Sequence, residues 1–226
     1  TVRNGAAFTM NGGIIKANHA RAGKDGGGVQ VEEGTFTMNG GTISDNTAEE
    51  TGGGVHLRNG TFTMSGGTIS RNAAPFGGGV GIDIRDAGTF TMSGGTISRN
   101  TAELFGGGVG VVKGAFTMEE GGTISGNIAH FGVGVGIFAD ETVTFIKTGG
   151  IIYGDTDATH TGSTENTATS AASGKGHAVA AMTYSGPNNV EVDEMKPYIG
   201  VPKYRDTTSG PNDDMDSSTE ENWTEN

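Results

Sequence analysis

Six ionisable side chains on three successive repeats are the best candidates for chemistry in this chain. His56 and Arg58 lie two residues apart, Asp83 follows about one repeat later, and Glu32 precedes them by about one repeat. Carboxylates and basic groups on neighbouring segments are what metal binding, proton abstraction or glycosidic cleavage requires. If the repeats stack in register, Asp83 lies within a few ångström of His56. The full set is Glu32, His56, Arg58, Asp83, Arg85 and Asp86.

A purely structural interpretation of these residues competes with the catalytic one. Each stands at an outward position of an expected strand or in the turn after it, where charged side chains are ordinarily solvated. We favour this interpretation, so we predict no catalytic residue, no metal site and no cofactor. His130, His160 and His177 occur without nearby partners in the sequence, and the acidic run of Asp155 and Asp157 is too short for a calcium loop.

An internal repeat defines the elements that would position these side chains. Each copy contains three short apolar/polar alternations, a pattern typical of strands with one buried face, and glycine or asparagine stands at the breaks. The sequence therefore predicts an all-β fold, a right-handed parallel β-helix with three short strands per coil and six to seven coils. The tripeptide Phe-Thr-Met begins at Phe8, Phe36, Phe62, Phe90 and Phe116, with a degenerate copy at Phe145, at spacings of 26 to 29 residues.

Stacked coils place equivalent residues in columns, which predicts the interior of the protein. An asparagine also recurs four residues after the threonine of the third alternation, and we expect an inward ladder of its side-chain amides. The asparagines are Asn18, Asn46, Asn72, Asn100 and Asn127, with Asn166 in an outer copy. The apolar columns are Phe36, Phe62, Phe90 and Phe116; Met38, Met64, Met92 and Met118; Ile43, Ile69, Ile97 and Ile124; and Val29, Val55, Val80 and Val109.

Composition narrows the classes of partner and the domain boundaries. The net charge of −12 argues against nucleic acid and anionic lipid as partners, and the absence of cysteine excludes disulfides and thiolate metal sites. No apolar run approaches the roughly 18 residues of a membrane span, so we predict no transmembrane segment. We assign residues 1–190 to the β-helix and 191–226 to a C-terminal cap strand and an acidic tail. The lack of an initiator methionine indicates a processed protein or a segment of a longer one.

The repeat Gly-Thr-Phe-Thr-Met-Ser-Gly-Gly-Thr-Ile-Ser-x-Asn, clearest at residues 88–100, resembles the Gly-rich β-helix repeats of large bacterial surface proteins and lipoproteins from spirochaetes and gut anaerobes. The end of the chain, from residues 166–168 and 176–179 through 203–211 to Trp223, is similar to the C-terminal block of such proteins. This resemblance covers nearly the whole chain and implies an exported, surface-associated β-helix. The lipid-anchoring cysteine that is common in such proteins is missing from this segment.

Three kinds of function fit these observations. We expect a non-catalytic extracellular or cell-surface rod, acting as a stalk, adhesin or filament element. Its expected partners are other copies of the same chain, bound end to end or through the C-terminal tail, a surface polysaccharide, or a host or matrix protein. One alternative is a β-helix polysaccharide lyase or hydrolase that uses the charged set above.

The other alternative is ice binding. The residues that flank each repeated phenylalanine point outward, which predicts a regular grid of threonine hydroxyls and methyls spaced about 4.8 Å apart between coils. Such a grid resembles the Thr-x-Thr face of insect antifreeze solenoids. Its members are Thr35, Thr37, Thr61, Thr63, Thr89, Thr91 and Thr117.

Overall fold

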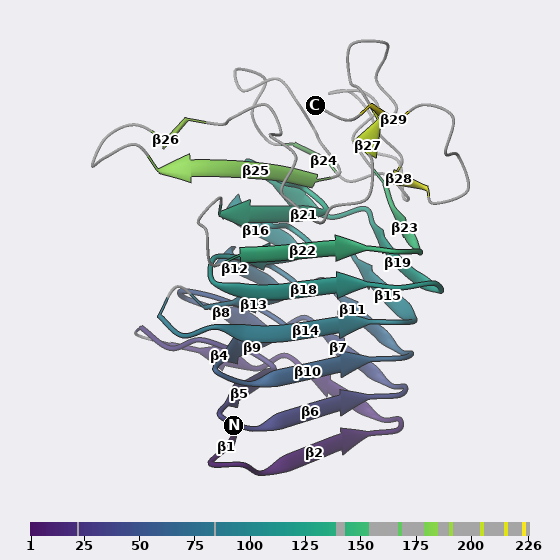
Figure 1. Ribbon diagram of the computed structural model, residues 1–226. Coiled ribbons are helices and arrows are strands. Elements are labelled where there is room, and N and C mark those ends of the chain that lie inside the picture. Colours follow the sequence, from purple (N-terminus) through teal and green to yellow (C-terminus); the bar gives the residue numbers. More distant parts are fainter. Residues whose placement is uncertain are drawn as a thin grey trace.

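The computed structural model describes residues 1–21, 23–83, 85–138 and 143–153, together with six short strands further along the chain. The described residues form strands and turns but no helix, and the chain winds as a parallel β-helix whose rows are stacked from β2 to β22 (Figure 1). Strands β1–β20 make five successive coils, and β21–β24 continue the same sheets into a sixth. The predicted all-β parallel β-helix is confirmed.

Two of the sheets carry the first two strands of every coil. Sheet 1 contains β1 (Val2–Arg3), β5 (Val29–Glu32), β9 (Val55–Arg58), β13 (Val80–Ile82), β17 (Val109–Val111), β21 (Val135–Phe138), β25 (Val179–Tyr184) and the antiparallel β26 (Val190–Glu191). Sheet 2 contains β2 (Ala7–Met10), β6 (Thr35–Met38), β10 (Thr61–Met64), β14 (Gly88–Met92), β18 (Gly114–Met118) and β22 (Val143–Lys147).

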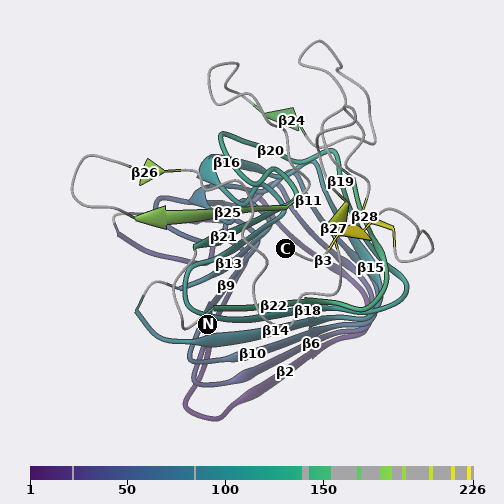
Figure 2. The ribbon, with the colours of Figure 1, turned by 45° about the horizontal axis from the view of Figure 1, so that its top comes forward.

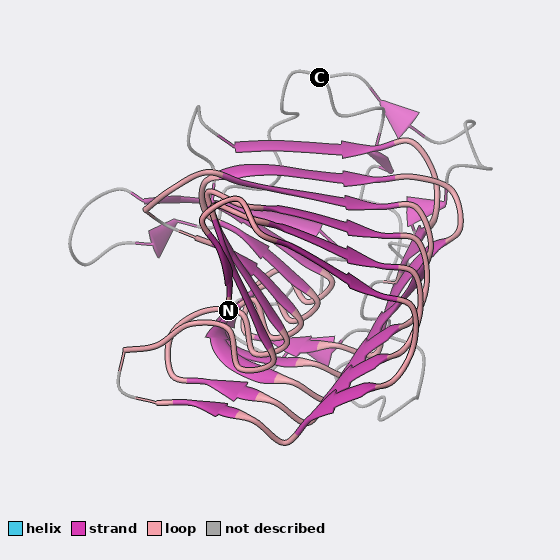
Figure 3. Ribbon diagram, turned by 90° about the horizontal axis from the view of Figure 1, so that it is seen from below, coloured by secondary structure: helices cyan, strands magenta, loops and turns pink. Residues whose placement is uncertain are grey.

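The other two large sheets complete each coil, so that the walls enclose a common interior (Figures 2 and 3). Sheet 3 contains β3 (Ile14–Lys16), β7 (Thr42–Ser44), β11 (Thr68–Ser70), β15 (Gly95–Ser98), β19 (Gly122–Ser125), β23 (Ile151–Ile152) and the antiparallel β28 (Met215–Asp216). Sheet 4 contains β4 (His19–Ala20), β8 (Thr47–Ala48), β12 (Ala73–Phe76), β16 (Thr101–Phe105), β20 (Ile128–Ala129) and β24 (Thr167–Ala168).

Each of the five coils therefore has four strands, where the sequence predicts three. The extra strand, in sheet 4, follows a sharp corner at which Asp45, Arg71 and Arg99 have φ values of 58°, 55° and 56°. A residue with a Cβ adopts this left-handed conformation at a cost of about 1 kcal/mol or more, so glycine is expected there. Glycine occupies this corner in the fifth coil, as Gly126 with a φ of 61°, but charged residues occupy it in the second, third and fourth coils, so the repeat does not mark the additional turn consistently.

The four predicted apolar columns are confirmed by strand register and burial. Phe62 pairs directly with Phe36 and with Phe90, and all three have no exposed surface. The Phe62 ring centroid lies 4.8 Å from that of Phe36 and 4.7 Å from that of Phe90, and the rings are nearly parallel. The methionine, isoleucine and valine columns run beside them and belong to the same buried cluster. Lys147 replaces methionine in the sixth row and is also buried. The interior is thus a set of stacked, like side chains.

The predicted asparagine ladder is confirmed for Asn18, Asn46, Asn72, Asn100 and Asn127. In Asn72, Oδ1 accepts bonds from the backbone N–H of Asn46 at 3.0 Å and from its Nδ2 at 2.9 Å, while Nδ2 donates to Oδ1 of Asn100 and to the carbonyl of Ile43, both at 3.0 Å. The same pattern recurs at Asn100. Each amide therefore satisfies buried backbone groups at the corner before sheet 4. Asn166 lies outside the described residues.

The C-terminal region contains backbone pairing that composition does not indicate. β28 pairs antiparallel with β23, and β27 (Tyr204–Arg205) pairs antiparallel with β29 (Trp223–Thr224). The boundary near residue 190 and the cap and tail assignments stay predictions. Of the isolated groups considered in the sequence, His160, His177, Asp155 and Asp157 lie outside the described residues. Within the described part of the chain, no helix is both long enough and apolar enough to cross a membrane.

Candidate functional site

The histidine of the predicted charged set lies on the outward face of sheet 1. His56, on β9, is in register with Gln30 on β5 and Gly81 on β13, as the repeat predicts. Our interpretation that it is solvated is wrong, because His56 has no exposed surface. The outward face of sheet 1 is therefore covered, and not exposed to solvent, at His56.

The covering of His56 comes from the glycine run that begins each coil. Gly52 has a positive φ of 70° and folds back over β9, so a Cβ added to it would lie 2.8 Å from His56 Cβ. The residue before it, Thr51, covers the next row, since its Cγ2 lies 2.4 Å from a Cβ added to Gly81. Only glycine fits at Gly52 and Gly81, because Thr51 and Gly52 lie directly over the outward face of sheet 1.

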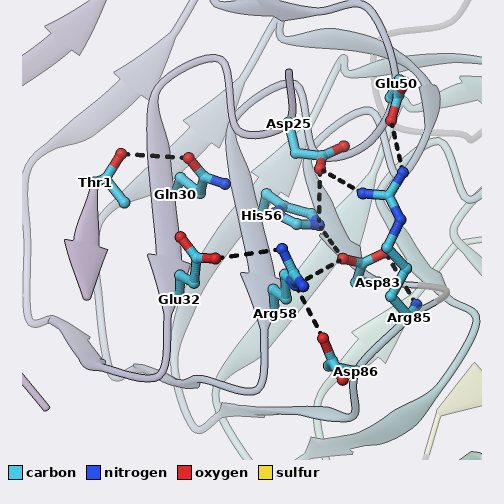
Figure 4. Close-up of polar contacts among 10 residues, drawn as sticks. All are labelled: Thr1, Asp25, Gln30, Glu32, Glu50, His56, Arg58, Asp83, Arg85 and Asp86. Carbon is cyan, nitrogen blue, oxygen red and sulfur yellow. Dashed lines mark hydrogen bonds and ion pairs between the residues drawn. The ribbon is translucent and has the colours of Figure 1, made fainter. Parts of the chain in front are cut away.

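Two buried carboxylates close the space around His56 (Figure 4). His56 Nε2 lies 3.6 Å from Asp83 Oδ2 and 3.9 Å from Asp25 Oδ2. The predicted proximity of Asp83 to His56 is confirmed, whereas the expected solvation of Asp83 is wrong, because that residue is 2% exposed. Burial raises the pKa of the Asp25 carboxyl, and the charge of Asp83 adds to this rise, while His56 opposes it.

Asp25 is the member of the cluster that the sequence reasoning missed. It occupies the position just before the Gly-Gly-Gly segment, which is Thr51 in the next coil and Phe76, Phe105 and Phe131 in those that follow. In the later coils the aromatic rings cover outward glycines; a Cβ on Gly136, for instance, would lie 2.5 Å from Phe105 Cδ2. An acidic residue in a column that is otherwise threonine or phenylalanine is the signal that was available in the sequence.

A partly exposed rim of ion pairs surrounds the buried cluster. Arg58 Nε donates to Asp86 Oδ2 at 2.9 Å, and its Nη1 lies 3.3 Å from Glu32 Oε1. The hydrogen bond to Asp86 raises the pKa of the Arg58 guanidinium. Arg85 Nη2 lies 3.6 Å from Glu50 Oε2. The expectation of outward, partly solvated side chains is confirmed for this rim.

Each arginine also approaches the buried carboxylates at the limit of an ion pair. Arg58 Nε lies 4.0 Å from Asp83 Oδ2, and Arg85 Nη1 lies 4.0 Å from Asp25 Oδ2. The backbone N–H of Arg85 donates to Asp83 Oδ1 at 3.2 Å, which holds the loop after β13 against the cluster. The sequence-predicted set is thus brought together, with Asp25 and Glu50 in addition.

The predicted threonine grid lies on the outer face of sheet 2. Thr61 pairs directly with Thr35 and Thr89, and all three are exposed; the second row, Thr37, Thr63, Thr91 and Thr117, is also in register and half-buried. The outward placement of the grid is confirmed, and its use as a binding face stays a prediction. Ala7, Ala115 and Ile146 interrupt the rows toward the two ends of the sheet.

The remaining described histidines do not join the buried cluster. His19 contacts Glu49 at 3.6 Å on the exposed first coil. The ring of His130 packs edge-on against Phe131, with their centroids 4.6 Å apart. Among the described residues, Asp25, His56 and Asp83 are the group of three whose donor atoms lie close enough together, within 4.8 Å of one another, to hold a metal ion.

Comparison with known proteins agrees with the coil architecture. A family model described as the right-handed β-helix region matches residues 2–149, which include the first five coils and β21 and β22. Comparisons with curated proteins and with solved structures gave no match. Because the matched region is well over half of the chain, this protein belongs to the right-handed β-helix family.

Proposed function

We propose that this chain is a non-catalytic rod on the cell surface or outside the cell, serving as a stalk or adhesive element. The observation that carries the proposal is the unbroken register of the phenylalanine column, from Phe8 to Phe145, through six rows. Repetition of this kind fixes length and stiffness rather than one local site, because every coil contacts only its neighbours. The resemblance to bacterial surface repeats supports the same role.

The burial of the charged cluster supports the absence of catalysis. An imidazole with no exposed surface does not contact a bound polysaccharide, and the arginines around His56 are already held by carboxylates. We therefore expect no release of unsaturated or reducing ends when the protein is incubated with a panel of acidic polysaccharides. Release that Arg58→Ala abolishes would contradict the proposal and favour a lyase or hydrolase.

The stalk role predicts that a whole coil is removable. Deleting residues 106–131 joins Phe105 to Gly132, and Phe105 is the direct partner of Phe131 across the removed coil. The shortened chain should fold, with a rod shorter by about 4.8 Å in small-angle scattering, because the columns close up in register. Cells that carry the shortened chain should still be labelled by antibodies without permeabilisation, and the shortened chain should still bind any matrix protein or surface polysaccharide that the intact chain binds.

A matched deletion of residues 119–131 serves as the control, since it removes half a coil and destroys the register. That variant should fail to fold. If the variant lacking residues 106–131 folds but no longer binds the matrix protein or polysaccharide, the stalk role is contradicted and the binding site lies on the fifth coil. Light scattering of the intact chain separates a single rod from end-to-end assembly, the filament form of the proposal.

Ice binding is a second candidate, favoured by the register of the threonine grid. The paired rows of sheet 2 place hydroxyls and methyls at a repeat of about 4.8 Å across the strands. Thermal hysteresis that Thr61→Tyr abolishes, while the fold is kept, would support this candidate. An intact protein without hysteresis removes it.

A further inference from the structure

Among the described residues, neither nitrogen of the fully buried His56 ring has a hydrogen-bond partner. This contrasts with the buried amides of Asn46, Asn72 and Asn100, which have hydrogen-bond partners along their ladder. A buried polar group without a partner costs free energy, so such a group in a native protein indicates a missing ligand, ion or water. Nε2 points into the space between the Asp25 and Asp83 carboxylates (Figure 4).

The distances in this space are too long for hydrogen bonds but suit a shared ion. His56 Nε2 is 3.6 Å from Asp83 Oδ2 and 3.9 Å from Asp25 Oδ2, and the three donor atoms lie within 4.8 Å of one another. Donors bound to a tetrahedral ion at 2.0–2.2 Å are about 3.3–3.6 Å apart. A contraction of about 0.5 Å or less would bring both imidazole–carboxylate distances into that range.

The charge around this space favours a cation. The ion pairs around it join five carboxylates to two guanidinium groups, an excess of three acidic side chains among the described contacts. Arg58 and Arg85 are engaged mainly by the partly exposed carboxylates of the rim, at 2.9–3.6 Å, and approach the buried pair only at 4.0 Å. A divalent ion would offset most of this excess. The carboxylates are Asp25, Glu32, Glu50, Asp83 and Asp86.

The donor set also selects the class of ion. One imidazole nitrogen with two carboxylate oxygens is suited to Zn²⁺, Mn²⁺ and related ions, whereas Ca²⁺ takes six to eight oxygens and Mg²⁺ keeps several waters. We propose that Asp25, His56 and Asp83 bind one divalent transition-metal ion, with Zn²⁺ the best fitted, as a structural centre of the β-helix. The three ligands precede β5, lie on β9 and follow β13, so the ion links three successive coils.

This centre is separate from the proposed function, because a rod with or without the ion serves equally as a stalk. It would take, near the start of the helix, the place that the Phe105 ring takes over the outward glycines Gly110 and Gly136 of sheet 1. The outward face of sheet 1 is thus covered by the ion and its ligands near the start of the helix and by an aromatic ring in later coils.

The test is a titration of the full chain, stripped with a chelating resin, by ZnCl₂, MnCl₂ and CoCl₂. We expect one Zn²⁺ per chain by elemental analysis, a Kd of about 1 µM or lower in calorimetry, and a melting temperature that rises with Zn²⁺ concentration. His56→Ala and the nearly isosteric Asp83→Asn should each weaken binding by about 100-fold or more and remove the rise in melting temperature.

His19→Ala is the matched control, because it removes an exposed histidine with an acidic neighbour and should leave the titration unchanged. If His56→Ala does not fold, Asp25→Asn and the visible absorption of Co²⁺ in the unaltered chain, which reports its coordination, decide the question. A stripped chain that binds none of these ions, or binding that persists in both ligand variants, would overturn the proposal. Equal competition by Ca²⁺ would overturn the assignment of ion class.

Discussion

Replacing Asn72 with alanine is expected to lower the free energy of unfolding by at least about 3 kcal/mol, because each buried polar group left without a partner costs about 1–3 kcal/mol. Three such groups result: the backbone N–H and the Nδ2 of Asn46, which both donate to Asn72 Oδ1, and the carbonyl of Ile43, which accepts from Asn72 Nδ2. Urea unfolding followed by circular dichroism measures the loss.

The matched control is Asn18→Ala, at the exposed end of the same ladder. Asn18 donates to Asn46 Oδ1 and to the carbonyl of Lys16, but water reaches these groups when the side chain is removed. The control should cost less than about 1 kcal/mol. Equal losses for the two variants would mean that the ladder does not satisfy the interior as described.

The second large effect is expected for Phe90→Ala, which should cost about 3–5 kcal/mol. Phe90 has no exposed surface, and its ring is stacked 4.7 Å from Phe62 and 4.8 Å from Phe116. Because both neighbouring rings are held in their own rows, the cavity closes poorly and the lost contacts are not replaced. The urea midpoint and slope, measured as for Asn72→Ala, report the change.

Thr91→Ala is the neighbouring control, since Thr91 is half-buried on the outer face of the same strand. Its cost should stay below about 1 kcal/mol. A larger loss for Thr91→Ala than for Phe90→Ala would reverse the inside and outside faces of sheet 2, and with them the placement of the threonine grid.

The interior could be predicted from the sequence because each column repeats one residue type at one period. The residue types of Phe62, Met64, Ile69 and Asn72 recur at the equivalent positions of every clear copy of the repeat. Stacking of the copies therefore identifies which side chains lie over one another. The fourth strand could not be predicted in the same way. In three of the five coils its corner carries a charged residue, such as Arg71, whose left-handed backbone cannot be recognised from the residue type.

For the charged site, the sequence predicts which side chains come together but not that they are buried. Register alone brings Asp83 beside His56, and that proximity was expected. Their burial depends on the path of the Gly-Gly-Gly segment, which a strand pattern does not reveal because glycine has no side chain to mark a face. Asp25 directly precedes that segment and belongs to no strand, and it is visible in the sequence only as an acidic residue in the column of Thr51 and Phe76.

Disulfide trapping tests the stacking of equivalent residues most directly, because the chain has no cysteine of its own. Thr63 and Thr91 are direct partners on neighbouring coils, whereas Thr37 and Thr91 are two coils apart. Directly paired Cα atoms are about 4.8 Å apart, within the range of a disulfide, and those two coils apart are about 9.6 Å apart, beyond it. Mild oxidation should therefore cross-link the double variant Thr63→Cys with Thr91→Cys and leave Thr37→Cys with Thr91→Cys reduced. Cross-linking of the second pair, or failure of the first in folded protein, would contradict the coil architecture.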